Sequence, residues 1–523
     1  MATKIILLVL FFSVSIGVGV WCRRRSRTVN GFVLGGRDVG PWLTAFAYGT
    51  SYFSAVIFVG YAGQFGYNFG VAATWIGLGN AFIGSLLAWV ILGRRTRVMT
   101  QHLGSRTMPD YFSLRYGSPA LKTAASAITF VFLIPYTASL FNGLSRLFAM
   151  AFPGVDYAVC VVAMAVLTAV YVVVGGYMAT AVNDFIQGMI MLVGIVAVIL
   201  AVLGQNGGLM ASLASMSQIP AETEHGTFFG AYTSLLGPKP LALLGVVLLT
   251  SLGTWGLPQM VGKFYAIKNE DAVRKGTVIS TVFAVVVAGG CYFLGGFARL
   301  FADDSFVKAN GFDAIIPRML ERLPDLLIAV VLILVLSASM STLSSLVLTS
   351  SSTLTLDFIA PMYKKKELTE KNKMLCLRIF IAVFILISAA IAILQAKSAV
   401  AFIAQLMGVS WGALAGAFLA PFLYGLFARR ITVASVWASF ACGVGIMLAE
   451  LVIMITGATF RTGFMQYFFG SPINAGVLAM LAGLVTVPLV SLVTKKPKAE
   501  HVEAVFACYD KEVSGKITES LGD

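Results

Sequence analysis

One run of small hydroxylated residues, at positions 336–345, has a pattern suited to binding a cation. Ala338, Ser341, Thr342 and Ser345 are spaced at i, i+3, i+4 and i+7, which places them on one face of an α-helix. Hydroxyl oxygens, together with one or two backbone carbonyls, suit a hard and weakly held cation such as sodium. The alternative is that these hydroxyls bond back to their own helix or join neighbouring helices. The pattern predicts a sodium site and leaves that alternative open.

A single carboxylate, that of Asp184, follows a Gly175-Gly176 pair near the start of a long apolar segment. A carboxylate in a membrane helix is costly and usually acts as a counter-ion or a gate. The structural alternative is a solvated helix N-terminus close to the cytoplasmic surface. Asp184 is also compatible with a proton relay, although the serine and threonine face favours sodium.

Two apolar segments contain residues that interrupt a helix, at positions 47–55 and 251–258. Glycine weakens a helix, and Pro258 cannot donate a helical hydrogen bond. Carbonyls freed by an unwound stretch could coordinate a cation, and irregular backbone in a membrane is tolerated only inside protein or around a cavity. Each interruption taken alone is equally consistent with an ordinary packing kink.

Membrane-spanning helices must position these groups. Of the 523 residues, 58% are hydrophobic and 11% are charged, and the mean hydropathy is +0.89. A soluble globular protein carries about 25% charged residues, so lipid must be part of the solvent of this chain. A spanning helix needs about 20 mostly apolar residues. Thirteen such segments are predicted, at residues 3–22, 42–66, 69–93, 120–150, 157–175, 180–204, 241–260, 276–299, 326–350, 375–395, 398–425, 432–456 and 472–494.

The positions of the two interruptions predict a substrate site. If the helix at 3–22 is set aside, the interruptions fall in the first and sixth of the remaining twelve helices, and because five is odd the two halves have inverted topology. Matching interruptions in two halves are the best sequence pointer to a transporter site near the bilayer midplane. The predicted organisation is an extra N-terminal helix (1–22), a first inverted repeat (42–204), a second (241–425), two additional helices (432–494) and a cytoplasmic tail (495–523).

Lysine and arginine residues predict the orientation. The net charge is +14, but the basic residues gather in short clusters beside apolar segments, as the positive-inside rule requires, which argues against nucleic-acid binding. The clusters lie at 23–37, 94–122, 263–275, 364–378, 429–430 and in the tail. They predict an external N-terminus and a cytoplasmic C-terminus in the inner cell membrane.

The two ends of the chain allow further predictions. Residues 3–22 are expected to be a retained helix and not a cleaved signal peptide, because Lys4 alone precedes the apolar stretch and no clear small-residue cleavage site appears before Trp21-Cys22. The tail is short and polar, and we expect it to be loosely ordered.

Other classes of function fit the residues less well. A channel would need repeated selectivity loops around a continuous pore, and nothing in the sequence resembles them. An enzyme would need a nucleophile with its base or a set of metal ligands, whereas the three histidines are scattered and the six cysteines have no metal-like spacing. We expect a transporter without catalytic residues, whose partners are a small solute and the lipid bilayer, with no obligate protein partner.

Motifs spread over nearly the whole chain resemble the sodium/solute symporter family, which includes proline, pantothenate, sialic-acid and glucose symporters. The motifs are Leu34-Gly35-Gly36-Arg37, the stretch 49–63, Met108-Pro109-Asp110-Tyr111-Phe112, Gly175-Gly176 with Asp184, Pro258 with Lys263-Phe264, and the stretch 338–344. Each motif is weak alone, but their order is specific. The resemblance implies an all-α, leucine-transporter-type fold with two inverted five-helix repeats, and solute uptake driven by inward sodium flux through alternating access.

The resemblance also implies which residues bind sodium, the co-transported ion. The carbonyls of Thr50, Phe53 and Ala338 and the hydroxyls of Ser341 and Thr342 match the common sodium site of the family. A second sodium site, known from two-sodium members such as the sialic-acid symporters, is matched by Ser341 and by three further residues. Those three are Asp184, Ser344 and Ser345.

The substrate is less constrained. The chain looks most like the bacterial proline and pantothenate branch, and Tyr136 matches it. However, Tyr52 replaces the acidic residue of the proline symporters, Val56 replaces a tryptophan, and Trp255 is shifted by one position. We expect an amino acid or a monocarboxylate; the alternatives are a sugar or sialic-acid carrier and a proton-coupled symporter. The residues expected around the substrate are Ser54, Ala55, Tyr136, Thr254 and Trp255.

Overall fold

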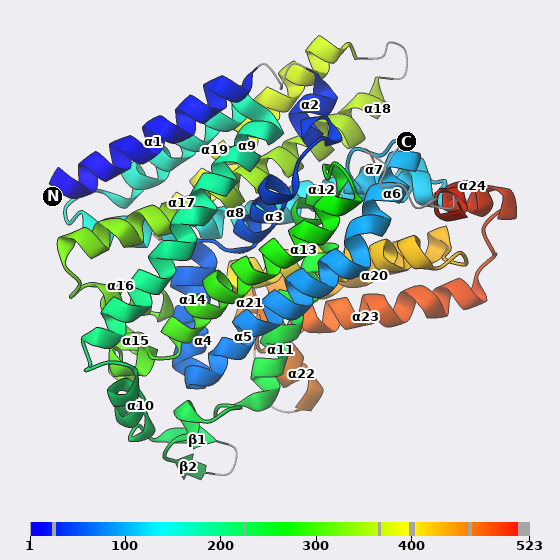
Figure 1. The fold of residues 1–523 in the computed structure, drawn as a ribbon. Helices are drawn as coiled ribbons and strands as arrows, with labels where there is room; N and C mark the ends of the chain where they lie inside the picture. The colour runs from blue at the N-terminus through cyan, green and yellow to red at the C-terminus, as the bar shows by residue number, and fades with distance from the viewer. Residues whose placement is uncertain are drawn as a thin grey trace.

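The computed structural model of the chain describes residues 2–23, 28–223, 226–363, 368–396, 403–458 and 463–510. Within these ranges the backbone is almost entirely helical, and the long helices lie side by side along one shared direction (Figure 1). The long helices are α1 (Ala2–Cys22), α8 (Pro119–Ala151), α9 (Tyr157–Gly204), α13 (Glu270–Ala284), α17 (Asp325–Thr353), α19 (Glu370–Ala396), α20 (Ile403–Phe427), α21 (Val433–Thr456) and α23 (Pro472–Val493). Eight residues of the predicted basic clusters lie outside the described residues: Arg24, Arg25, Arg27, Lys364, Lys365, Lys366, Lys511 and Lys516.

By length and composition, ten of the described helices can cross a membrane, or eleven if one bent pair is a single span. The prediction of thirteen is therefore not confirmed. The difference arises in two places. The span Val56–His102 has 47 residues, roughly 70 Å of helix, which is more than twice the thickness of the hydrocarbon core. The helix α9 is broken at Gly176, which has φ 56° and ψ −152°, and its first part, Tyr157–Val170, falls below the length of a span.

Both predicted interruptions are confirmed. The helix α3 (Pro41–Tyr52) ends at Phe53, whose backbone is extended, and the chain continues through a π-helical stretch, Val56–Tyr61, into α4 (Ala62–Phe69). The helix α11 (Pro240–Ser251) is separated from α12 (Pro258–Tyr265) by a bend of 47°. A proline disfavours helical backbone at the residue before it, and Leu257, which precedes Pro258, is accordingly extended.

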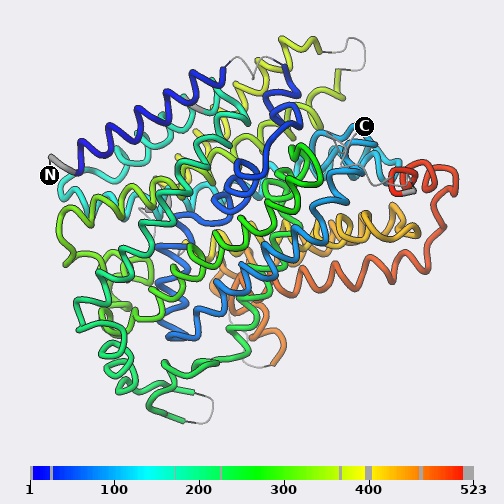
Figure 2. Tube along the Cα trace, in the orientation of Figure 1, coloured from blue at the N-terminus to red at the C-terminus, as the bar shows by residue number. Residues whose placement is uncertain are grey.

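The two broken helices are buried in the bundle, since residues 44–52 of α3 and all residues of α12 except Gly262 are buried; Figure 2 traces the chain through both. The helix α17 packs against α3, α8 and α9. The face predicted from the serine and threonine pattern is therefore buried among the helices that contain the breaks and Asp184. The helix α1 lies along the edge of the bundle, against α9 and α17.

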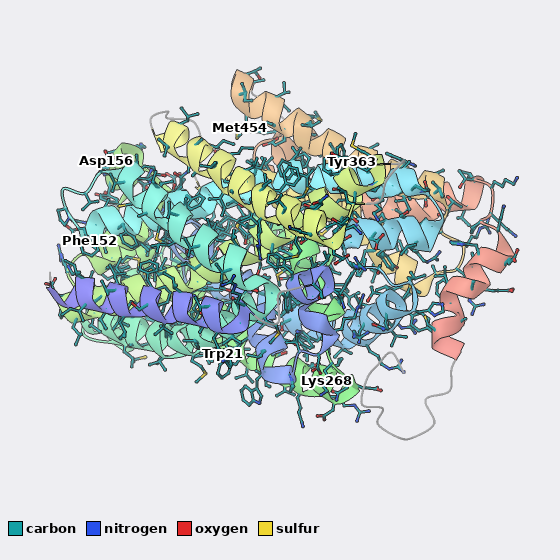
Figure 3. All side chains as sticks on the ribbon, turned by 90° about the horizontal axis from the view of Figure 1, so that it is seen from above. Trp21, Phe152, Asp156, Lys268, Tyr363 and Met454 are labelled. Atoms are coloured by element: carbon teal, nitrogen blue, oxygen red, sulfur yellow. The ribbon has the colours of Figure 1, made fainter. Side chains whose placement is uncertain are left out.

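The short elements separate into two groups at opposite ends of the bundle (Figure 1). One end, called here the basic end because the predicted basic clusters flank it, contains α2 (Val29–Leu34), α6 (Arg94–His102), α7 (Met108–Tyr116), α18 (Ala360–Met362) and α24 (Ala499–Asp510). The opposite end contains α10 (Leu209–Ser217), α15 (Asp304–Asn310), α16 (Ile315–Leu320), α22 (Gly463–Phe469) and the antiparallel strands β1 (Ala221–Thr223) and β2 (Gly226–Phe228). Figure 3 shows the same separation: Phe152 and Asp156 lie at one end, and Lys268 and Tyr363 lie toward the other.

The expectation of a loosely ordered tail is wrong for residues 499–510, which form α24. Its residues Val502 and Phe506 are buried. The ring of His102 on α6 lies 2.8 Å from the Ala504 carbonyl, and the Tyr509 hydroxyl donates to the Arg95 carbonyl at 3.2 Å. The apolar face of α24 therefore holds this part of the tail against α6.

The helices α4 and α14 (Gly290–Gly295) approach each other more closely than side chains would allow. A Cβ atom added to Gly66 would lie 1.8 Å from the Gly295 carbonyl oxygen, and one added to Gly295 would lie 2.2 Å from the Ala62 oxygen. Since real Cβ atoms do not approach other atoms so closely, the sequence requires glycine at both positions. The close approach lies on the side of the Phe53 break away from the basic end.

Candidate functional site

Four oxygen atoms meet where α3 is interrupted beside α17. The Thr342 hydroxyl lies 3.2 Å from the Thr50 carbonyl oxygen, 3.1 Å from that of Phe53 and 3.0 Å from that of Ala338. A hydroxyl has one hydrogen to donate, so it satisfies one of the three carbonyls at a time. The last carbonyls of a helix have no partner within it, which explains why the end of α3 supplies two of these oxygens.

The fifth predicted sodium ligand, Ser341, lies next to this group. Its hydroxyl is buried and has no hydrogen-bond partner among the described residues. It is close enough to the Asp184 carboxylate to interact with it. The structure thus brings four of the five predicted atoms into direct contact and leaves the Ser341 hydroxyl with an unused oxygen beside them.

A buried chain of polar groups lies beyond Ser341 and connects four helices. Asp184 on α9 is fully buried, so the alternative of a solvated helix end is wrong. The Lys263 ammonium on α12 lies 3.7 Å from an Asp184 carboxylate oxygen and donates to the Ser345 hydroxyl of α17 at 2.9 Å. The Ser345 hydroxyl is in turn 2.8 Å from that of Ser51 on α3.

Lys263 therefore lies between Asp184 and Ser345, two of the residues predicted for a second sodium ion. The third, Ser344, directs its hydroxyl to the Ser341 carbonyl at 2.8 Å, within its own helix. Sequence reasoning noted Lys263 in a family motif and counted it in the basic loop cluster 263–275, and this placement is wrong, because Lys263 is buried in α12. The available signal was a lysine between apolar residues in a membrane helix, which is by itself a pointer to function.

A second group of buried polar atoms lies at the other side of the α3 break. The Tyr136 hydroxyl on α8 lies near the Ser54 hydroxyl and the Trp411 indole of α20, and the Tyr136 and Trp411 rings pack edge to face at 5.9 Å. The Ser54 and Tyr136 hydroxyls and the Trp411 indole nitrogen have no hydrogen-bond partner among the described residues. Buried polar groups are normally satisfied, so three uncharged donors at one place indicate a site for an acceptor.

Of the other residues predicted around the substrate, Ala55 lies with this group. Its amide donates to the Ser339 hydroxyl at 3.1 Å, and its methyl group faces Gly143 on α8. Trp255 points elsewhere, since its indole donates to the Ile83 carbonyl at 3.0 Å. The Thr254 hydroxyl bonds back to the Ser251 carbonyl at 2.7 Å.

Sequence reasoning missed Trp411. Its signal was a large aromatic residue between Gly408 and Gly412, in a helix that is otherwise rich in small residues. Tyr52, which is part of α3, connects the two interrupted helices: its hydroxyl donates to the Thr250 carbonyl of α11, and its ring packs against Trp411 at 6.0 Å.

A small cavity of about 50 Å³ leads from the basic end toward the buried polar chain. Arg106 and Thr107, in the loop before α7, line its outer part, and Lys263 and Ser345 line its inner part. The cavity thus reaches the buried polar chain from the basic side.

The sequence and the fold both have known relatives. The model of the family described as "Sodium:solute symporter family" matches residues 32–443. The osmoregulated proline transporter OpuE of Bacillus subtilis is 26% identical over 98% of this chain and 99% of its own length. A sodium/proline symporter of Staphylococcus aureus is 28% identical over 94% of this chain and 93% of its own length.

Two solved structures share the fold. A sodium-coupled sialic acid symporter, in a substrate-bound outward-open state, superposes with a TM-score of 0.69 at 15% identity, over 95% of this chain and 99% of its own. The nucleobase-cation-symport-1 transporter Mhp1, in a closed conformation, superposes with a TM-score of 0.50 at 14% identity, over 91% of this chain and 97% of its own.

Proposed function

The chain belongs to the sodium:solute symporter family, and we propose that it carries an amino acid, with L-proline as the first candidate, across the membrane. It is a multi-pass membrane protein and a secondary active transporter, not an enzyme, and sodium is its co-transported ion. Proline is the first candidate because two relatives that match nearly the whole chain are proline transporters.

The proposed sodium ligands are Thr50, Phe53, Ala338, Ser341 and Thr342. The contacts of the Thr342 hydroxyl with three carbonyl oxygens support this assignment, because neutral oxygens at a broken helix are the groups that hold a hard cation in such transporters. The second sodium ion, at Asp184, Ser344 and Ser345, stays a prediction. Such an ion would have to take the position of the Lys263 ammonium.

The observation that carries the substrate proposal is the group of three unpartnered donors at Ser54, Tyr136 and Trp411. Hydroxyl and indole donors without a formal charge suit the oxygens of a carboxylate, and the aromatic rings suit a small apolar body. The second half of the broken helix begins at Ala55, whose amide donates to the Ser339 hydroxyl beside this group. An amino acid or a monocarboxylate carries a carboxylate for these donors, which a neutral sugar lacks. The roles of Thr254 and Trp255 stay predictions.

We also propose that the N-terminus is external, that the basic end faces the cytoplasm, and that the membrane is the inner cell membrane. The concentration of basic clusters at one end supports this orientation. The proposed division into two inverted repeats, 42–204 and 241–425, is supported by the matching breaks at Phe53 and Leu257. No role in nucleic-acid binding and no obligate protein partner are proposed.

The decisive experiment records the melting temperature of the purified protein with each of several solutes, in sodium or in potassium. The panel contains L-proline, other amino acids, monocarboxylates, pantothenate and sugars. A ligand that binds the native state raises the melting temperature by mass action. We expect L-proline to raise it more in sodium than in potassium. Equal shifts in both salts, with folded protein, would favour a proton-coupled carrier.

Matched variants separate the two sites. Tyr136→Phe removes one donor and keeps the ring, so it should weaken the solute-dependent shift and preserve the shift caused by sodium alone. Thr342→Ala removes a proposed sodium ligand, so it should weaken the shift of the melting temperature that sodium alone causes. If Tyr136→Phe leaves the whole solute profile unchanged, the substrate site lies elsewhere.

A further inference from the structure

Lys263 is buried in the membrane together with the one carboxylate it faces. The Lys263 and Asp184 side chains are 4% and 0% exposed. A buried carboxylate without a cation is strongly unfavourable, and Lys263 is the cation that this structure places beside Asp184. Its ammonium has three donors and three neighbours: the Asp184 carboxylate at 3.7 Å, the Ser345 hydroxyl at 2.9 Å and the face of the Tyr177 ring at 5.3 Å.

The oxygens around the ammonium are also those that a sodium ion would use. Neither Asp184 carboxylate oxygen has a hydrogen bond in the described part of the chain, and the Ser341 hydroxyl beside them has none. With Ser345, these groups supply two carboxylate oxygens and two hydroxyl oxygens. Hard cations prefer such ligands. The position is therefore a complete cation site whose occupant is an ammonium group of the chain itself.

Two cations cannot share this position favourably. A sodium ion beside Lys263 would place two positive charges against a single carboxylate, and like charges at a few ångströms repel strongly where the dielectric constant is low. The sodium site at Thr342 does not have this problem, because its ligands are neutral. The position at Thr342 can therefore accept a sodium ion from solution, whereas the Asp184 carboxylate is already neutralised by Lys263.

We infer that Lys263 is the resident cation of the position formed by Asp184, Ser341 and Ser345. This inference rests on the proposed sodium-coupled function. The transporter therefore binds one sodium ion, at Thr342, and replacing Lys263 with a neutral side chain creates a second sodium site at Asp184. The cavity that reaches Lys263 from the basic end gives an ion access to that position when the ammonium is absent.

The test counts sodium ions bound per chain, using sodium chloride as the only probe and purified full-length protein. Isothermal titration, with choline replacing sodium, is applied to the wild type, Lys263→Gln, Lys263→Arg and the double variant Lys263→Gln/Asp184→Asn. We expect one ion for the wild type and for Lys263→Arg, two for Lys263→Gln, and one for the double variant. Circular dichroism and size-exclusion chromatography establish that each protein is folded.

A folded Lys263→Gln protein that binds no more sodium than the wild type overturns the inference and makes the Asp184–Lys263 pair purely structural. If Lys263→Gln does not fold, the wild type decides: two ions per chain overturn the inference and one supports it. The proposed function fails in a different way. If the wild type binds no sodium but Lys263→Gln gains one ion that Asp184→Asn removes, the Lys263 assignment stands and the site at Thr342 falls.

Discussion

The two positions proposed to hold a cation lie side by side on α17, and they are built in opposite ways. At Thr342, one hydroxyl and three backbone carbonyls gather around a break in α3, and none of these groups carries a formal charge. At Ser345, one helical turn away, a full carboxylate on Asp184 faces a full ammonium on Lys263. Both positions are completely buried.

On the proposed assignment, the position at Thr342 holds a transported sodium ion, whereas the Lys263 ammonium stays in place. Neutral oxygens hold a sodium ion with modest strength, so the ion can enter and leave during each cycle. A buried pair of opposite charges is costly to separate, because each charge left alone lacks both water and a partner. Mutations at the two positions should therefore have different consequences: loss of sodium binding at one and loss of stability at the other.

The largest effect is expected for Asp184→Asn. Removing one member of a buried ion pair typically costs about 3–5 kcal/mol, because it leaves an uncompensated charge. We expect a large fall in the melting temperature in detergent or nanodiscs. The double variant Asp184→Asn/Lys263→Gln, which leaves no charge, should regain most of the loss. A single variant as stable as the wild type would mean that the two groups are not an ion pair.

Thr342→Ala should act on sodium and leave the fold largely intact. It removes a ligand oxygen, and we expect the sodium affinity to fall at least about tenfold, which corresponds to about 1.4 kcal/mol. Thr342→Ser keeps the hydroxyl and is the matched control. Sodium-dependent stabilisation of the purified protein measures both variants. Unchanged sodium dependence in Thr342→Ala would show that the common site is misplaced.

An exposed ion pair provides the contrast to the buried one. Asp304 on α15 accepts from the Tyr67 hydroxyl and lies 3.2 Å from the Arg299 guanidinium. These contacts, the Tyr67 hydrogen bond first, lower the pKa of Asp304 below its ordinary 3.8. A lowered pKa stabilises the fold above the ordinary pKa, and the contribution is lost as the pH falls through the folded value.

For Asp304→Asn we therefore expect a loss of at most about 1 kcal/mol at pH 7, as for other exposed pairs. The difference in the free energy of unfolding between Asp304→Asn and the wild type should shrink as the pH falls below 3.8. Thermal unfolding at several pH values measures it. A loss as large as that of Asp184→Asn would show that burial is not what distinguishes the two pairs.

The smallest effect is expected for Ser344→Ala. The Ser344 hydroxyl is bonded to the Ser341 carbonyl of its own helix, and such bonds within a helix contribute little, so sodium affinity should change by less than about threefold. Titration of sodium-dependent stabilisation measures it beside Thr342→Ala. A fall in affinity as large as that of Thr342→Ala would indicate that Ser344 does bind a second sodium ion.

The sequence predicts the parts of the site that depend on local patterns. The hydroxyl face of α17 follows from helical spacing, and the breaks follow from Gly49, Gly253 and Pro258. Lys263 and Trp411 could not be assigned in this way. Their roles depend on partners from distant segments, Asp184 and Tyr136, and spacing along the chain does not reveal which distant side chains meet.

The boundaries of the elements were predicted less well for a similar reason. Residues 499–510 are polar enough to suggest a loose tail, but Val502 and Phe506 are buried, and the Arg115 guanidinium of α7 lies over the Phe506 ring. The distinction between one long helix and two spans at 56–102 depends on bends that composition does not specify. Burial of Asp184 likewise depends on α17 and α12 covering it.

The direct backbone contact of Gly66 with Gly295 has a mechanical consequence. With no side chains between them, α4 and α14 cannot slide or rotate past each other without forcing main-chain atoms to overlap. One of these helices belongs to each predicted repeat, so we expect α4 and α14 to move together as a unit. Opening toward the side away from the basic end must then come from other helices swinging around this joint.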